Sequence, residues 1–196
     1  MLYNVGMKNI VILISGRGSN MQAVVNAAHV QKWPARIAAV ISNRADADGL
    51  VFAQQHGIPT IVVASSDYAT RVAFDAALQS AIEPFSPDLV VLAGFMRILT
   101  PQFVQHYDGR LLNIHPSLLP RFKGLHTHRQ ALQANVTEHG ATVHLVTAEL
   151  DHGPILGQAT VPVLPDDTED TLAQRVLEQE HILYPGVIRQ ILEGKR

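Results

Sequence analysis

Two polar side chains interrupt an apolar stretch at residues 111–116, which reads LLNIHP. The apolar residues predict a buried strand, and side chains alternate across a strand, so Asn113 and His115 lie on the same face. Pro116 restricts the backbone of His115 to an extended conformation. An imidazole exchanges protons near pH 7, and an amide donates to an oxygen that gains negative charge. The spacing therefore predicts acid–base chemistry with oxyanion stabilisation; a capped strand end with a surface histidine is the alternative.

A carboxylate that could serve the same chemistry is Asp151, in the segment ELDHGP. Aspartate ahead of Gly-Pro is also a good turn former, which is the simpler interpretation. If this turn folds back towards His115, the carboxylate would favour the charged imidazole ring and could steer a water molecule or an amine. Asp151 is therefore a candidate that depends on the fold.

A glycine-rich turn, SGRGSN at residues 15–20, follows an apolar run and precedes a helical pattern. Open parallel sheets bind ligands at such turns, and the N–H groups of Gly18, Ser19 and Asn20 would point at an anion. The third glycine of a dinucleotide motif is missing, because Met21 stands in its place. The turn therefore predicts a site for a single phosphate monoester, or merely a tight connection between strand and helix.

Other charged and histidine side chains are weaker candidates. For Arg71, Arg97 and Glu180 the simplest interpretation is a solvated charge, although Arg71 could reach an anion at the rim of the cleft. On a strand, the spacing His126-x-His128 could place two metal ligands on one face, but polarity at a helix start and packing are the simpler explanations for most of the histidines. The chain has no cysteine and no H-E-x-x-H motif, so we expect no metal site.

The elements that must position these residues alternate along the first 115 residues. Patterns typical of buried strands occupy residues 9–15, 35–42, 58–63, 88–94 and 111–115. Helical patterns occupy residues 21–30, 47–57 and 65–82, and a fourth helix starts at Thr100. Gly57 is predicted to end the second helix, Ser66 or Asp67 to cap the third, and Pro101 to take the first position of the fourth.

The pattern changes after about residue 139. Residues 140–163 read as two strands around a turn at 151–154. Residues 167–194 form a long closing helix, capped by Asp167 or Thr168, which Pro185 is expected to kink or interrupt. The predicted fold class is α/β: an open, mostly parallel twisted sheet with helices on both faces, a C-terminal antiparallel strand pair and a long closing helix.

Composition narrows the class of protein. The chain has 196 residues, of which 47% are hydrophobic and 16% charged, which indicates a globular fold with a substantial core. A net charge of −2 gives no electrostatic case for nucleic-acid or membrane binding. The absence of cysteine suits the cytoplasm, and we expect neither a signal peptide nor a membrane span. Residues 1–6 are predicted to be a disordered extension.

Six segments together resemble the phosphoribosylglycinamide formyltransferases, a family of folate-dependent transferases of purine synthesis. They read ISGRGSN, ISNRADADG, DLVVLAGFMRILTPQFV, GRLLNIHPSLLPRFKGLHTHRQAL, HGATVHLVTAELDHGPILGQA and QEHILYP. They follow the family's order from about Lys8 onward, and NIHPSLLP and GLHTHRQAL are the specific blocks. The resemblance implies one Rossmann-like formyltransferase domain over residues 1–196. Its phosphate-binding half would be residues 8–107, and its folate-binding and catalytic half residues 108–196.

The resemblance also implies the activity: transfer of formyl from 10-formyltetrahydrofolate to the amine of glycinamide ribonucleotide, in de novo purine biosynthesis and without a metal. The implied catalytic residues are Asn113, His115 and Asp151. The implied substrate-binding residues are Gly18, Ser19, Asn20, Arg71 and Glu180. The implied folate-binding residues are Met96, Arg97, Ile98, Leu99, Asn113, Val146, Thr147 and Asp151. The expected partners are these small molecules, without nucleic acid or membrane, and the expected form is a cytoplasmic monomer or homodimer.

Three residues, Arg17, Lys123 and His152, depart from what the resemblance leads us to expect, and would change substrate affinity and the local response to pH. Related families remain alternatives. Formyltetrahydrofolate hydrolases use water instead of an amine, and methionyl-tRNA and sugar-amine formyltransferases are larger proteins. A non-catalytic phosphate sensor would need the glycine-rich turn but not the catalytic set.

Overall fold

A computed structural model describes residues 6–195, so most of the extension predicted at residues 1–6 lies outside the described residues. The strands are β1 Lys8–Ile14, β2 Ala35–Ser42, β3 Thr60–Val62, β4 Leu89–Leu92, β5 Leu111–His115, β6 Glu138–Leu145 and β7 Ile155–Pro162. The α-helices are α1 Ser19–Val30, α2 Asp48–Gln55, α3 Arg71–Ile82, α4 Pro101–His106, α5 Thr127–Gln133 and α6 Glu169–Leu192. Short 3₁₀ helices cover Ser65–Asp67 and Glu83–Phe85.

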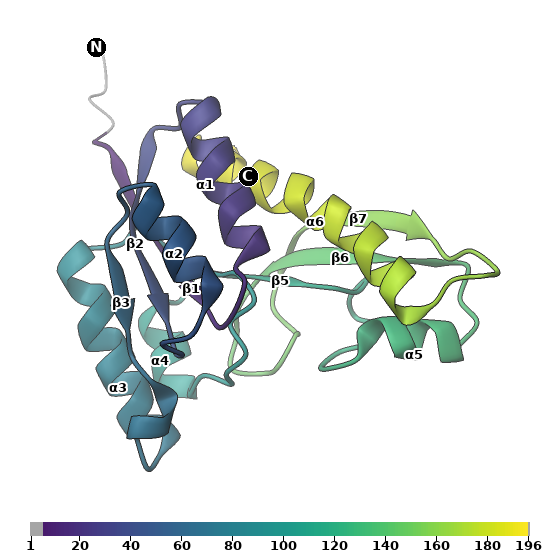
Figure 1. Cartoon of the computed structure of the whole chain (residues 1–196), viewed down its shortest axis with the longest axis horizontal. Coiled ribbons are helices and arrows are strands. Elements are labelled where there is room, and N and C mark those ends of the chain that lie inside the picture. Colours follow the sequence, from purple (N-terminus) through teal and green to yellow (C-terminus); the bar gives the residue numbers. More distant parts are fainter. Residues whose placement is uncertain (1–5, 196) are drawn as a thin grey trace.

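All these strands join one sheet in the order β3-β2-β1-β4-β5-β6-β7 (Figure 1). The pairs β2–β3, β1–β2, β1–β4 and β4–β5 are parallel, whereas β5–β6 and β6–β7 are antiparallel. The predicted fold class is therefore confirmed, including the change of strand direction in the C-terminal part. The carboxyl ends of β1, β2, β4 and β5 meet at one edge of the sheet.

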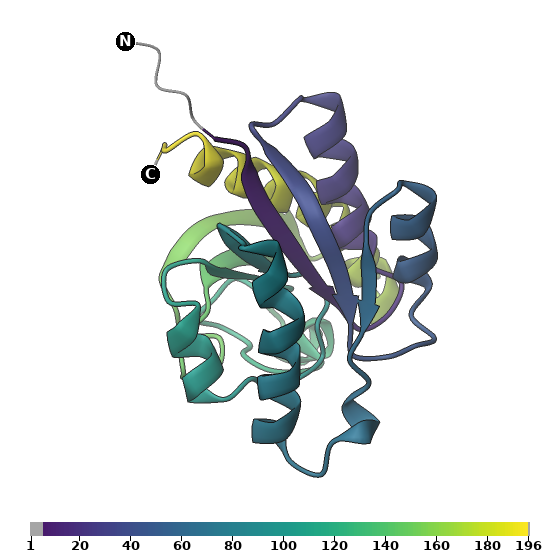
Figure 2. The same cartoon turned by 90° about the vertical axis from the view of Figure 1, so that its left-hand side faces the viewer.

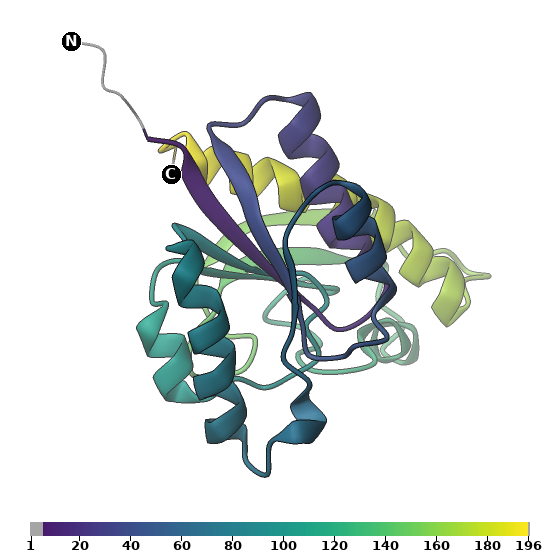
Figure 3. The same cartoon turned by 60° about the vertical axis from the view of Figure 1, so that its left-hand side comes forward.

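Helices cover both faces of the sheet (Figures 2 and 3). Alternate residues of β1 point to opposite faces: Ile10, Ile12 and Ile14 join the core beneath α1, α2 and α6, while Val11 and Leu13 join the core beneath α3 and α4. Burial on both faces explains why the parallel strands read as continuous apolar runs rather than as alternating ones.

The closing helix α6 lies against α1, β6 and β7 (Figure 1). Thr168 caps it, accepting from the N–H of Thr171, whose hydroxyl accepts from the N–H of Thr168 in return. The helix continues through Pro185, so the predicted interruption does not occur. The Tyr184 hydroxyl lies 2.9 Å from the Leu92 carbonyl oxygen and 3.1 Å from that of Leu112, and so fastens the helix to β4 and β5 at this point.

The first strand and the last helix also meet at their outer ends. The Lys8 ammonium group donates to the carbonyl oxygen of Leu192 over 3.0 Å. This contact satisfies one of the carbonyl groups that an α-helix leaves without an internal partner at its C-terminus. The beginning of β1 and the end of α6 therefore lie side by side.

One local prediction was wrong. The helix expected over 65–82 begins only at Arg71, and its cap is Thr70, which accepts from the N–H of Ala73 at 3.1 Å, rather than Ser66 or Asp67. The chain is extended at Tyr68, whose ring packs against that of Phe74 in α3, so the helix does not run back through residue 68.

The pair His126-x-His128 stands at the start of α5, and not on the strand that two metal ligands at this spacing would require. His126 is the left-handed residue before this helix, with φ 58°, and His128 belongs to its first turn. A hydrogen bond from the Thr127 hydroxyl to the Pro116 carbonyl oxygen, 2.6 Å long, holds the start of the helix against the loop that follows β5. Period-two alternation therefore does not apply to this pair.

Candidate active site

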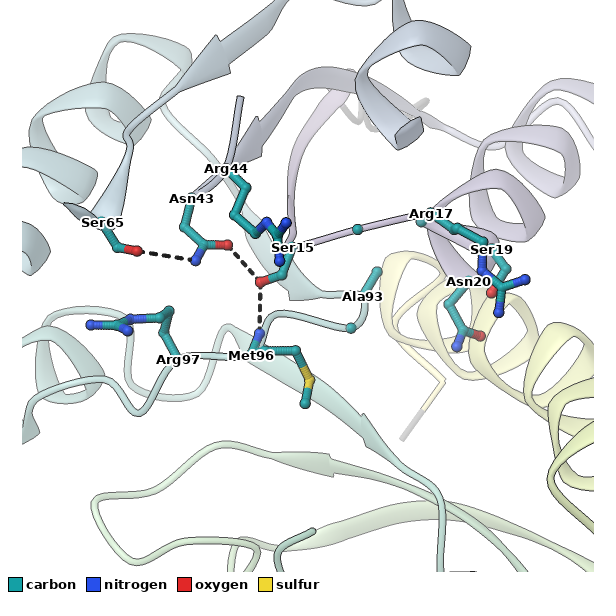
Figure 4. A pocket seen from close by; sticks show the side chains of 13 residues that line it. Ser15, Arg17, Ser19, Asn20, Asn43, Arg44, Ser65, Ala93, Met96 and Arg97 are labelled. Atoms are coloured by element: carbon teal, nitrogen blue, oxygen red, sulfur yellow. Dashed lines mark hydrogen bonds between the residues drawn. The ribbon is translucent and has the colours of Figure 1, made fainter. Parts of the chain in front are cut away.

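A cavity of about 500 Å³ opens at the carboxyl edge of the sheet (Figure 4). Ser15, directly after β1, joins the segments around it. Its hydroxyl donates to the Asn43 side-chain oxygen at 2.6 Å and accepts from the Met96 N–H at 2.8 Å. The Asn43 amide then donates to the Ser65 hydroxyl at 3.4 Å. The segments after β1, β2, β3 and β4 thus form one connected polar wall.

The glycine-rich turn forms the opposite side of this cavity (Figure 4). Gly18 has φ +67°, and a Cβ atom there would lie 3.0 Å from Met21 Cε and 3.4 Å from the Gly49 backbone. Glycine is therefore required both by conformation and by the close approach of α2. Helix α1 begins at Ser19, so its first N–H groups and positive dipole end face the cavity, as an anion requires.

The charge of the cavity wall also favours an anion. Arg17, Arg44 and Arg97 line it, and no described residue of the lining is acidic. Arg44 is paired with Asp46 at 2.7 Å, and the Arg97 guanidinium lies 5.7 Å from the centre of the Phe74 ring. Arg17, in contrast, makes no ion pair with any residue from 6 to 195. Its charge remains available to a ligand.

A buried carboxyl group from α6 lies beside the turn. Glu180 is only 7% exposed, and its Oε2 accepts from the Asn20 amide at 2.6 Å. Burial raises the pKa of Glu180, and the hydrogen bond from Asn20 opposes this shift. The Asn20 side-chain oxygen is buried and has no partner within the described residues. The pair therefore offers an acceptor to a ligand hydroxyl or amine.

Asp151 and His115 come together at the same edge of the sheet. Asp151 Oδ2 lies 3.5 Å from Nδ1 of His115 and accepts from the N–H of Gly124 at 2.9 Å. The other ring nitrogen of His115, Nε2, donates to the Phe122 carbonyl oxygen at 2.9 Å. His115 and Asp151 are 6% and 8% exposed, so water screens their interaction weakly.

A histidine that sequence reasoning did not assign to the site, His144, completes the group. Strand β6 pairs it with Asn113 on β5, and its Nε2 lies 3.2 Å from the Asn113 amide nitrogen. Its Nδ1 faces the Leu145 carbonyl oxygen at 2.8 Å and must donate, so Nε2 accepts from the amide. Burial lowers the pKa of His144, which agrees with this neutral form. One N–H of the Asn113 amide thus stays free for a ligand.

Asp151 reaches the site because residues 146–154 form a closed loop. The N–H of Leu145 donates to the Pro154 carbonyl oxygen at 3.0 Å, joining the two ends of the loop. A Cβ at Gly153 would overlap the Leu145 carbonyl oxygen at 1.7 Å, so only glycine fits at this closure. Asp151 itself has φ +49°, a conformation that aspartate tolerates better than most residues.

The remaining predicted residues are distributed unevenly. Met96 and Arg97 line the cavity, while Ile98 is exposed next to them and Leu99 packs against the core under α3 and α4. Val146 donates its N–H to Leu111, and the Thr147 hydroxyl donates to the Glu149 carbonyl oxygen. Arg71 is the exposed first residue of α3 and is not among the residues that line the cavity.

Lys123 and His152 both contact the side chain of Glu149. Glu149 Oε1 lies 3.6 Å from the Lys123 ammonium nitrogen, and Oε2 lies 3.3 Å from Nδ1 of His152. The contact joins the loop after β5 to the loop before β7. All three side chains are at least one-third exposed, so the expected stabilisation is small, about 0–1 kcal/mol.

Among residues 6–195 there is no group of three or more histidine or acidic side chains arranged to hold a metal ion. No helix in the same part of the chain has the length and apolar character needed to cross a membrane.

Known proteins resemble this chain over nearly its whole length. A family model described as formyl transferase matches residues 8–188. The phosphoribosylglycinamide formyltransferase of Escherichia coli K12 is 54% identical over 187 residues, which cover 95% of this chain and 88% of that protein.

Solved structures agree with the sequence match. The phosphoribosylglycinamide formyltransferase of Coxiella burnetii, in complex with CHES, is 50% identical with a TM-score of 0.90, covering 96% of this chain and 88% of that one. Glycinamide ribonucleotide transformylase 1 of Symbiobacterium toebii is 45% identical with a TM-score of 0.95, covering 99% and 92%. The chain therefore belongs to the formyl transferase family.

Proposed function

We propose that the chain transfers the formyl group of 10-formyltetrahydrofolate to the amine of glycinamide ribonucleotide. The products are formylglycinamide ribonucleotide and tetrahydrofolate, and the step belongs to de novo purine biosynthesis. The relatives of like length carry the names of this transferase. The observation that carries the proposal is the convergence of Asn113, His115 and Asp151 at the sheet edge that also holds the anion cavity.

The proposed chemistry is attack by a neutral amine on the formyl carbon. The carbon–nitrogen bond to the amine forms, and the carbonyl oxygen becomes an oxyanion in a tetrahedral intermediate. The free N–H of the Asn113 amide and the protonated ring of His115 stabilise this oxygen. Removing one such donor typically lowers the rate about 10²- to 10³-fold. His144, by accepting from the other amide hydrogen, holds Asn113 in the donating orientation.

Collapse of the intermediate breaks the bond between the formyl carbon and the folate nitrogen. The proton lost by the attacking amine must reach that leaving nitrogen. Asp151 Oδ2 faces Nδ1 of His115 at 3.5 Å, and both side chains are almost fully buried. We assign to the Asp151 carboxylate the role of orienting the water that carries this proton, a contribution of about 10²- to 10⁴-fold in rate.

The two substrates occupy different parts of the sheet edge in this proposal. The phosphate of the ribonucleotide lies on the N–H groups of Gly18, Ser19 and Asn20, with Glu180 facing its sugar and glycinamide part. The folate lies over Met96 and the segment that follows it, and over the loop 146–154. Met96 and Ile98 are 65% and 59% exposed, so they offer apolar surface on which the ring system of the folate can pack.

The wider predictions from the sequence remain proposals. We propose one domain whose residues 8–107 bind phosphate and whose residues 108–196 bind folate and carry the catalytic groups. We further propose that the protein works in the cytoplasm on small molecules alone, as a monomer or homodimer.

The test is a turnover assay with 10-formyltetrahydrofolate, in the presence and absence of glycinamide ribonucleotide. We expect release of tetrahydrofolate only when the amine is present, with one formylated product for each folate consumed. Equal release without the amine would make the protein a hydrolase, and no release in either mixture would leave a phosphate-binding protein without catalysis. Glycinamide riboside, which lacks the phosphate, is the control for the anion cavity.

A further inference from the structure

A second pair of histidines lies behind His115. His139 Nε2 and His128 Nδ1 are 3.2 Å apart, with their rings nearly perpendicular. His139 lies on β6 and is fully buried, and its Nδ1 has no partner within the described residues. The transfer chemistry uses neither ring, although a buried polar side chain is costly for a fold to keep.

Phe122 connects this pair to His115. Its ring packs edge to face with that of His139, with ring centres 5.8 Å apart and planes at 66°. The carbonyl oxygen of the same Phe122 accepts the hydrogen bond from His115 Nε2. One residue therefore contacts the buried histidine with its side chain and the catalytic candidate with its backbone.

The backbone of Phe122 is in an unfavourable conformation. Its φ is +54°, in the left-handed region that bulky residues rarely adopt. Such a conformation persists only where its surroundings hold it, and it commonly occurs at functional sites. Here the left-handed turn directs the carbonyl oxygen at the imidazole, and the contact with His139 holds the side chain of the turn.

We propose that His139 is a positioning residue: its ring, packed against Phe122, holds the Phe122 carbonyl oxygen that fixes the proton on Nε2 of His115. With that proton fixed, Nδ1 is the ring nitrogen that faces Asp151 and the substrate. The inference deepens the proposed formyl transfer and rests on it for its kinetic consequence. The orientation of His115 itself does not depend on which reaction the site performs.

The electrostatics of the pair fit this role. Burial lowers the pKa of His139 to about 4, and the positive charges that His128 and His115 can carry lower it further. Burial also lowers the pKa of His128, an effect that Glu169 opposes. Both rings are therefore neutral near pH 7, so neither adds a positive charge next to His115.

Three variants separate positioning from mere loss of stability. His139→Ala removes the ring that packs against Phe122. His139→Phe keeps a ring there but loses the hydrogen bond to His128. Phe122→Ala removes the same contact by changing its other partner, a half-buried residue. Leu78→Ala is the matched control, because Leu78 is fully buried in the core beneath α3 and α4, on the opposite face of the sheet. Melting temperatures establish that the control is at least as destabilised as the variants.

Two measurements are made on the full chain. The first is the nitrogen-15 NMR spectrum of the His115 ring, assigned with a His115→Gln variant and recorded at a pH where the ring is neutral, so that it reports which nitrogen carries the single proton. We expect a protonated Nε2 in the unchanged chain, in Leu78→Ala and in His139→Phe, and a mixture of ring tautomers in His139→Ala and Phe122→Ala. The second is the separate kcat and KM for formyl transfer, where the two alanine variants should lose kcat by up to about 10²-fold with little change in KM.

The outcomes decide between the inference and the proposed function. An unchanged His115 spectrum in both His139→Ala and Phe122→Ala overturns the positioning role, whatever the rates. If the unchanged chain shows no turnover while the spectra change as expected, the transfer reaction is wrong and the positioning role stands. A loss of kcat in Leu78→Ala as large as in His139→Ala would assign the kinetic effect to stability and overturn the kinetic part of the inference.

Discussion

At the scale of single residues, the site depends on which hydrogen each nitrogen carries. Carbonyl oxygens only accept, so Phe122 fixes a proton on Nε2 of His115 and Leu145 fixes one on Nδ1 of His144. Asn113 then has one N–H engaged and one free. The backbone, rather than the side chains alone, therefore determines what the site can donate.

A prediction at this scale concerns Asp151→Asn. The amide is of the same size and can still accept from the Gly124 N–H, but it carries no negative charge to hold the imidazolium or to accept a proton from water. We expect kcat to fall by about 10²- to 10⁴-fold. Binding of glycinamide ribonucleotide, followed by titration calorimetry, should stay close to that of the unchanged chain.

The matched control for that change is Asp108→Asn, an exposed aspartate after α4, away from the site. Its rate should match that of the unchanged chain. An Asp151→Asn protein with nearly normal kcat would exclude the carboxylate from the transfer step.

Part of this constellation could be predicted from the sequence. The spacing of Asn113 and His115 placed them on one strand face, and the resemblance brought Asp151 to them; the structure places all three together. His144 was not predicted as a site residue, because its position opposite Asn113 follows from the register between β5 and β6. Register depends on contacts between strands, which one strand's own pattern does not reveal.

At the scale of elements, one hydroxyl group joins α6 to β4 and to β5, the strand that carries Asn113 and His115. Tyr184 is fully buried, and its hydroxyl meets carbonyl oxygens at the ends of β4 and within β5, next to Asn113. Burial raises the pKa of this phenol well above its usual value, so the hydroxyl is a donor near neutral pH. The helix thereby helps to fix the position of β5 relative to β4 in the sheet.

Tyr184→Phe tests this connection. Removing the hydroxyl leaves buried carbonyl oxygens short of a partner, so we expect the free energy of unfolding to fall by about 1–3 kcal/mol. Urea denaturation provides the measurement. Tyr68→Phe is the control, because the Tyr68 hydroxyl makes no hydrogen bond with residues 6–195, and its loss should leave the midpoint unchanged. Equal midpoints for both variants would contradict the role of Tyr184.

Element boundaries show where sequence patterns stop being informative. The strand at 35–42 and the strand at 111–115 have the predicted ends, because buried apolar runs end where the chain leaves the sheet. The helix predicted over 65–82 begins six residues late, because the chain is extended at Tyr68 and Thr70 caps the helix. A helical period does not reveal which of several possible caps starts the helix, since Ser66, Asp67 and Thr70 are all good cap residues.

At the scale of the whole molecule, buried histidines connect stability to pH. Burial lowers the pKa of His128, His139, His144 and His181. The unfolded chain takes up protons on these rings below about pH 6.5, while the folded chain keeps them neutral to a lower pH. The unfolded state therefore binds more protons, and stability falls as pH falls from about 6.5 towards the lowered pKa values.

His139 provides the quantitative prediction. Its pKa near 4 in the folded state implies that protonation of the unfolded chain lowers the free energy of unfolding by about 2 kcal/mol at pH 5. His139→Phe has no such group, so the difference in unfolding free energy between pH 7 and pH 5 should be smaller by about this amount. Urea denaturation at pH 7, 6 and 5 is the measurement, and parallel curves for the two proteins would contradict it.

The contact between Lys8 and the end of α6 has a consequence for how the polypeptide can be rearranged. Because the two outer ends of the fold are neighbours, a short glycine-serine linker can join them without crossing the molecule. New ends can then be opened in an exposed turn remote from the cavity, such as the one around Asn135, between α5 and β6. In such a circularly permuted chain the glycine-rich turn would come after the loop 146–154 in the sequence. Both segments would still occupy the same places in the structure.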